Sequence, residues 1–140
     1  MNYGNYFYAF DPNNAADKDE YKKNILLIST IRDVLNEYRI NVKSKGYMFM
    51  QDAICIITDL QRMDICFEKE VYPLIAKKYD AGGSYAIEHG IRNAINKAYD
   101  TFTNTSPESS GIFDMKPTNK TFLLMATQEV GSRLLKELID

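Results

Sequence analysis

The sequence has few residues that could build a catalytic or metal-binding centre. Its 140 residues include one histidine, His89, and two cysteines, Cys55 and Cys66, which do not form a CxxC pair. Metal sites and nucleophilic centres need several such side chains at characteristic spacings, and no glycine-rich phosphate loop follows a strand pattern. A pair of one cysteine with His89 stays open, although no other feature supports it. We therefore expect no enzyme, no catalytic residues, no metal, no cofactor, and two buried, reduced thiols.

Long apolar segments are also absent. No apolar run approaches the roughly 20 residues that a membrane span requires, and the first residues lack the charged and apolar regions of a secretory signal. Hydrophobic residues make up 45% of the chain and charged residues 26%, as in ordinary globular domains. We expect a cytoplasmic protein with one main domain and no contact with a membrane.

Hydrophobic periodicity predicts an all-α fold, a compact bundle of about six helices. The expected helices cover residues 21–39, a strongly apolar and therefore central segment at 47–63, a region at 64–79, residues 84–99, and a last helix capped by Thr118 or Asn119. Pro73 indicates a helix that either starts near Tyr72 or bends there.

The ends of the expected helices leave two other segments. Residues 1–22 read as an aromatic and polar N-terminal arm that packs on its own domain or on a partner subunit, and the main domain covers 23–140. In the loop at 101–116, Ile112 and Phe113 are expected to pack onto the core.

The segment from Tyr72 to Tyr99 reads as two helices joined by a tight turn. Gly82 and Gly83 suit the turn because glycine reaches positive φ without a Cβ clash. Ser84 is the expected N-cap of the second helix. A short helix, a glycine turn and a second helix are the layout of a helix-turn-helix.

The second of these helices has two faces. Its apolar stripe consists of Ile87, Ile91, Ala94, Ile95 and Ala98. Its polar face consists of Tyr85, Glu88, His89, Arg92 and Asn96, flanked by Asn93 and Lys97. Arginine and asparagine can read base edges in the major groove. The same pattern occurs in αα-hairpins that contact no DNA, and the net charge of −2 does not favour nonspecific binding to phosphates.

Several segments together resemble a known family. In chain order they are Lys45-Gly-Tyr47, Ala53-Ile54, Val71-Tyr-Pro-Leu-Ile-Ala-Lys-Lys-Tyr79, Glu88, Ile91-Arg92, Ala94-Ile95, and Lys116-Pro-Thr-Asn119 followed by Phe122. This order is similar to the C-terminal DNA-binding effector domain of the master sporulation response regulator, over roughly residues 24 to 135. The Tyr-Pro-x-Ile-Ala-Lys-Lys and Lys-Pro-Thr-Asn segments are the specific part of the resemblance.

The resemblance implies a winged-helix-like, all-α domain without a clear wing, with an embedded helix-turn-helix that binds double-stranded DNA and regulates transcription. Members bind as dimers, and the last helix resembles their dimer contact. By position, the candidates for base reading are Ser84, Tyr85, Glu88, His89, Arg92 and Asn93. The candidates for contacts with the DNA backbone are Lys78, Lys97, Lys116 and Thr118.

The chain also departs from the family pattern. Its residues include no receiver domain with a phosphate-accepting aspartate. The family has Arg where His89 stands, His where Asn93 stands, and a further Arg near Tyr85, and residues 100–115 contain three acidic and no basic residues. Each lost cation weakens phosphate binding. An alternative is therefore an interaction module with impaired DNA binding, which pairs with and modulates a full-length response regulator.

Overall fold

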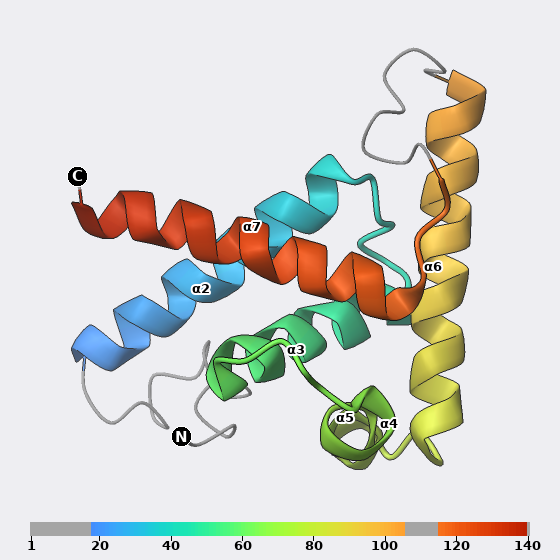
Figure 1. The fold of residues 1–140 in the computed structure, drawn as a ribbon, viewed down its shortest axis with the longest axis horizontal. Helices are drawn as coiled ribbons and strands as arrows, with labels where there is room; N and C mark the ends of the chain where they lie inside the picture. The colour runs from blue at the N-terminus through green and yellow to red at the C-terminus, as the bar shows by residue number, and fades with distance from the viewer. Residues whose placement is uncertain (1–17, 106–114, 140) are drawn as a thin grey trace.

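The computed structural model describes residues 18–105 and 115–139, and every regular element in these ranges is a helix (Figure 1). The helices are α2 (Lys18–Glu37), α3 (Lys45–Leu60), α4 (Phe67–Glu70), α5 (Tyr72–Tyr79), α6 (Ser84–Thr105) and α7 (Asn119–Ile139). The predicted all-α bundle is confirmed, with α4 as a single turn. No helix in the described ranges combines the length and apolarity that a bilayer crossing requires.

Two predictions concern residues outside the described ranges, wholly or in part. Positions 1–17 of the expected arm, and the packing of Ile112 and Phe113, lie outside the described residues. Residues 18–22, which the sequence places in the arm, form the beginning of α2.

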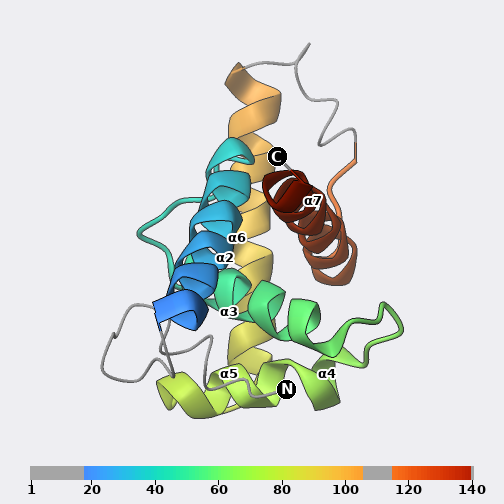
Figure 2. The ribbon, with the colours of Figure 1, turned by 90° about the vertical axis from the view of Figure 1, so that its left-hand side faces the viewer.

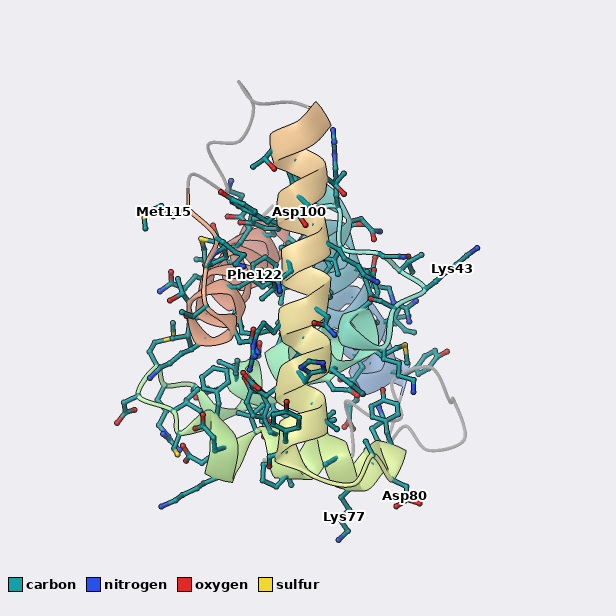
Figure 3. The ribbon with its side chains drawn as sticks, turned by 90° about the vertical axis from the view of Figure 1, so that its right-hand side faces the viewer. Lys43, Lys77, Asp80, Asp100, Met115 and Phe122 are labelled. Atoms are coloured by element: carbon teal, nitrogen blue, oxygen red, sulfur yellow. The ribbon has the colours of Figure 1, made fainter. Side chains whose placement is uncertain are left out.

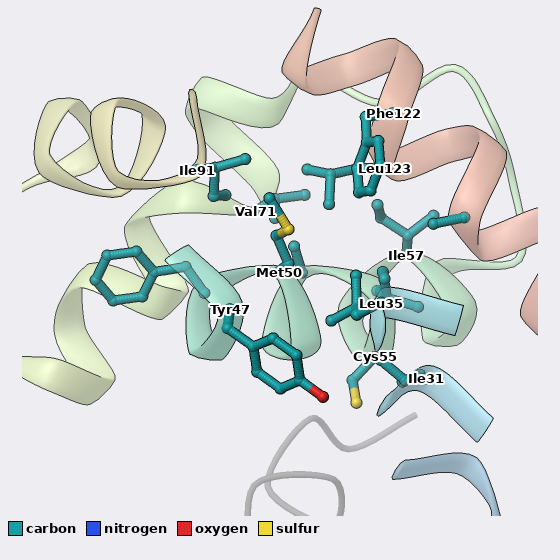
Figure 4. Packing of buried hydrophobic residues seen from close by; sticks show 14 of the residues in the cluster. Ile31, Leu35, Tyr47, Met50, Cys55, Ile57, Val71, Ile91, Phe122 and Leu123 are labelled. Atoms are coloured by element: carbon teal, nitrogen blue, oxygen red, sulfur yellow. The ribbon is translucent and has the colours of Figure 1, made fainter. Parts of the chain in front are cut away.

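Helix α3 lies at the centre of the bundle, as its all-round apolarity predicts. Twelve of its sixteen residues are buried, and α2, α5, α6 and α7 all pack against it. Figure 4 shows Met50 and Ile57 of α3 among core residues that include Leu35 of α2 and Leu123 of α7. Burying one such side chain contributes roughly 1.5–3 kcal/mol, so α3 is the scaffold on which the other helices are placed.

The two cysteines differ in their surroundings. Cys55 is buried in α3, and burial raises the pKa of its thiol. Cys66 is exposed, so the expectation of two buried thiols is wrong for this residue. It holds the N-cap position of α4, at the end of a connection that runs mostly over the surface. Both thiols are free, and no cluster of three metal-binding side chains occurs among the described residues.

Helix α5, the turn after it and α6 form the expected helix-turn-helix. Helix α5 begins at Tyr72 with Pro73 in its first turn. Of the two options that the sequence left open, the helix start near Tyr72 is therefore confirmed. In the turn, Asp80 and Gly82 have φ angles of 50° and 87°, whereas Gly83 does not have a positive φ. The turn therefore needs glycine at one of the two predicted positions, Gly82. The second residue with left-handed φ and ψ is Asp80, and aspartate tolerates this conformation better than most residues do.

The inner face of α6 is the apolar stripe that the sequence predicts. Its five residues are at most 4% exposed: Ile87, Ile91, Ala94, Ile95 and Ala98. They pack α6 against α3 and α5, and the helix stands along one side of the molecule behind α2 and α7 in the view of Figure 2. The helix begins at Ser84, so Ser84 is its first residue and not the N-cap that precedes it.

Helices α3 and α6 lie very close together at Gly46. A Cβ atom on Gly46 would lie 2.4 Å from the carbonyl oxygen of Gly90 and 2.6 Å from the Cβ atom of Ala94. A Cβ atom on Gly90 would lie 2.9 Å from the ring of Phe49. Since the first of these contacts involves backbone, no side chain on Gly46 fits unless α6 moves away from α3.

We expect Gly46→Ala to lower the free energy of unfolding by about 1–3 kcal/mol, because the added methyl group overpacks the crossing of α3 and α6. Urea denaturation followed by circular dichroism measures this loss. Gly131→Ala is the matched control, since a Cβ atom on Gly131 in α7 meets nothing within 4 Å. That change is expected to stabilise the helix by roughly 0.5–1 kcal/mol. A Gly46→Ala variant as stable as the wild type would contradict the close crossing.

Candidate nucleic-acid interface

The outward face of α6 presents the residues that the sequence assigns to base reading. They are Ser84, Tyr85, Glu88, His89, Arg92 and Asn93, with Lys97 one turn further on. Tyr85 is 74% exposed, and His89 and Asn93 are also exposed, while Ser84 and Glu88 are half-buried. Figure 3 looks onto this side of the molecule, with α6 in front of the bundle. The helix thus presents a continuous polar surface to solvent.

Two pairs of side chains organise this surface. The guanidinium of Arg92 donates a hydrogen bond to the carboxylate of Glu88 one turn earlier, and this ion pair raises the pKa of Arg92. The rings of Tyr85 and His89 are stacked, with centroids 5.7 Å apart and an angle of 13° between the planes. Arg92 keeps further N–H donors after pairing, and its side chain is 48% exposed. It therefore remains able to bind an acceptor outside the protein.

A groove runs beside this face, between α6, the start of α5, the α3–α4 connection and the start of α7. It encloses about 900 Å³, and four of the predicted residues line it: Glu88, Arg92, Lys116 and Thr118. Asn96 and Lys120 line it as well, and neither was among the predicted site residues. The structure thus brings residues of α6 together with the Lys-Pro-Thr-Asn segment, although they are far apart in the sequence.

The charges around the groove are mixed. Asp64, Glu68 and Glu88 contribute carboxylates, and Arg92, Lys116 and Lys120 contribute cations. Since Glu88 and Arg92 are paired with each other, the other cations that line the groove are the two lysines near the start of α7. The positive end of the groove is therefore at the start of α7, whose helix dipole adds to it.

Lys78, a candidate for a DNA backbone contact, lies away from the groove and binds a buried carboxylate. Its Nζ atom is 3.1 Å from both carboxylate oxygens of Asp52, which also accept a hydrogen bond of 2.6 Å from the hydroxyl of Tyr79. The side chain of Asp52 is 2% exposed and that of Lys78 is 27% exposed. This cluster connects α5 to α3. No sequence pattern indicated it, because Asp52 occurs within an otherwise apolar helix.

Thr118 caps α7, as the sequence predicts. Its hydroxyl oxygen accepts a hydrogen bond of 3.1 Å from the main-chain N–H of Thr121. Asn119, the other predicted cap, is instead the first residue of the helix, and its side chain donates to the carbonyl oxygen of Glu88. The sequence could not predict that contact, because it joins residues from two separate helices.

The chain matches the model of a known protein family. The family model described as "Sporulation initiation factor Spo0A C terminal" matches residues 31–130, which are 100 of the 140 residues. The match contains α3 to α6 whole, and it contains every residue that lines the groove. The matched domain is a DNA-binding effector without catalytic activity.

The buried Asp52 generates a prediction about pH. Burial raises the pKa of Asp52 from its ordinary 3.8, and the hydrogen bond from Tyr79 and the charge of Lys78 offset this only in part. The folded protein therefore holds the Asp52 proton more tightly than the unfolded chain does. The resulting stabilisation is complete below the unfolded pKa and is lost as the pH rises through the folded pKa.

We expect the free energy of unfolding of the wild type, relative to Asp52→Asn, to fall as the pH is raised from about 4. Urea denaturation at a series of pH values measures this difference. Asp33→Asn, which removes an exposed carboxylate on α2, is the control for general charge effects. If this difference in free energy of unfolding increased as the pH is raised, it would contradict a raised pKa of Asp52.

Proposed function

Because the chain belongs to the family of Spo0A C-terminal effector domains, which bind DNA and regulate transcription, we propose that it recognises a specific duplex sequence. In this proposal the outward face of α6 enters the major groove. The observation that supports it most directly is the arrangement of α5, the turn and α6, in which an exposed polar face projects from a helix attached to the bundle by its buried stripe.

Each residue of the outward face has a role that its chemistry suits. Arg92 binds the O6 and N7 acceptors of a guanine, and Asn93 binds an adenine edge. Glu88 accepts from the amino group of a cytosine while it orients Arg92. His89 contributes N–H or acceptor atoms from the same face, and Ser84 and Tyr85 make contacts at the entry of the helix.

Contacts with phosphates position the domain on the duplex. Lys97 flanks the reading face on α6, and Lys116 and Thr118 lie at the groove beside it. Lys78, which is paired with Asp52, belongs to this set because its side chain is 27% exposed at the surface of α5. With a net charge of −2, we expect binding that depends on these few cations and therefore on salt.

We further propose that the protein acts in the cytoplasm and binds DNA as a homodimer through α7. Leu135 on this helix is 59% exposed, which makes it suited to a contact between copies. A second candidate function, in which the domain pairs with and modulates a full-length response regulator, is favoured by the three carboxylates of the groove. A lone protein that binds DNA with nanomolar affinity would remove the need for this second function.

Selection of bound sequences from a pool of random duplexes, at moderate salt, tests sequence recognition directly. We expect a short consensus element that contains at least one guanine. A pool that stays random after repeated rounds would contradict the proposal.

On the selected element, we expect Arg92→Ala to weaken binding by roughly 5- to 150-fold, which corresponds to the loss of one bidentate contact to guanine worth about 1–3 kcal/mol. Binding to a random duplex of equal length should change far less. Fluorescence anisotropy measures both affinities. Lys43→Ala is the charge-matched control, because Lys43 extends into solvent from the connection between α2 and α3 (Figure 3). Equal losses on both duplexes would show that Arg92 reads no base.

For Lys116→Ala we expect the opposite pattern. Affinity should fall to a similar extent on the selected and the random duplex, because a phosphate contact carries no sequence information. The slope of log affinity against log salt should become shallower by roughly one. A titration series at several salt concentrations measures this slope, and a slope equal to that of the wild type would exclude a phosphate contact by Lys116.

A further inference from the structure

The side chain of Asn119 connects the start of α7 to the side of α6. Its Nδ2 atom donates a hydrogen bond of 2.8 Å to the main-chain carbonyl oxygen of Glu88, 31 residues earlier in the chain. A carbonyl oxygen within a helix accepts the N–H group four residues further on and has a second lone pair for another donor. The amide of Asn119 can therefore hold α6 without interrupting its helical hydrogen bonds.

Asn119 also lies beside the start of α5. Tyr72, the first residue of α5, is 2% exposed and lines the same groove as Asn119. Burial raises the pKa of Tyr72, and the nearby side chain of Asn119 lowers it in part. One side chain at the start of α7 thus lies next to both helices of the helix-turn-helix.

The way the helices pack explains why this contact affects the rotation of α6 about its own axis. Helix α6 packs chiefly against α3 and α5, and α7 packs chiefly against α2 and α3. The apolar stripe fixes the depth of α6 in the bundle, but a rolling motion about its own axis is opposed mainly by contacts on its flanks. Glu88 and Arg92 are four residues apart and lie on the same side of α6, so a roll that moves Glu88 from Asn119 also moves Arg92.

We propose that Asn119 is a positioning residue, which fixes the rotation at which α6 presents Glu88 and Arg92 to base edges. The inference rests on the proposed function. Without the amide, α6 occupies a wider range of rotations, and bidentate contacts to bases are lost first, because they need a fixed geometry. Contacts with phosphates tolerate small shifts, so discrimination between sequences falls more than nonspecific affinity.

Asn119→Asp and Asn119→Ala separate this role from a structural one. Asn119→Asp keeps the shape of the side chain but removes the donor, and a carboxylate at the N-terminus of α7 is favourable to that helix. Thr121→Asp is the matched control, because it adds the same charge at an exposed position of the same helical turn. Circular dichroism first identifies a temperature at which all variants and the wild type are folded.

At that temperature, the affinities of the full chain for the selected duplex and for a random duplex are measured, and their ratio is compared. We expect the ratio to fall roughly fivefold or more in both Asn119 variants, as the loss of one hydrogen bond implies, and to stay unchanged in Thr121→Asp. A ratio in Asn119→Asp equal to that of Thr121→Asp overturns the role of Asn119 alone. A wild-type protein that does not discriminate contradicts the proposed function on which the inference rests.

Discussion

At Gly46, α3 and α6 approach so closely that a side chain has no room between them. This contact holds α6 against the most buried helix of the bundle, and the apolar stripe of α6 completes the attachment on the same side. The rest of the surface of α6 therefore faces away from the bundle. The position of every polar side chain on that face therefore depends on packing within the protein, and the helix can present them to a partner without first becoming ordered.

Several cations on and around α6 lie close to carboxylates. Arg92 is paired with Glu88, and Lys78 is paired with Asp52. Lys116 and Lys120, beside the start of α7, line a groove that also holds carboxylates. Such a surface attracts DNA weakly by charge alone. In the proposed function, most of the free energy of binding must therefore come from correctly oriented contacts, and such contacts favour discrimination between sequences over general attachment to nucleic acid.

The sequence predicts those features that depend on local pattern. The helix order, the central place of α3 and the buried stripe of α6 follow from periodicity. Pro73 predicts either a helix start or a bend near Tyr72, and only the structure decides between them. The sequence fails where an outcome depends on contacts between distant residues or on exact backbone angles. Cys66 lies at the surface, Gly83 needs no positive φ, and the partners of Asp52 and Asn119 come from other helices. No local sequence pattern encodes the exposure of Cys66, the φ angle of Gly83 or the partners of Asp52 and Asn119.

In the proposed function, the outward face of α6 lies in the major groove of the selected element. Dimethyl sulfate interference on that duplex probes this placement, because the reagent methylates N7 of guanine in the major groove and N3 of adenine in the minor groove. We expect methylation of guanine N7 within the element to block binding, and methylation of adenine N3 elsewhere in the element to leave binding unchanged. Interference confined to adenine N3, or absent from guanine N7, would contradict it.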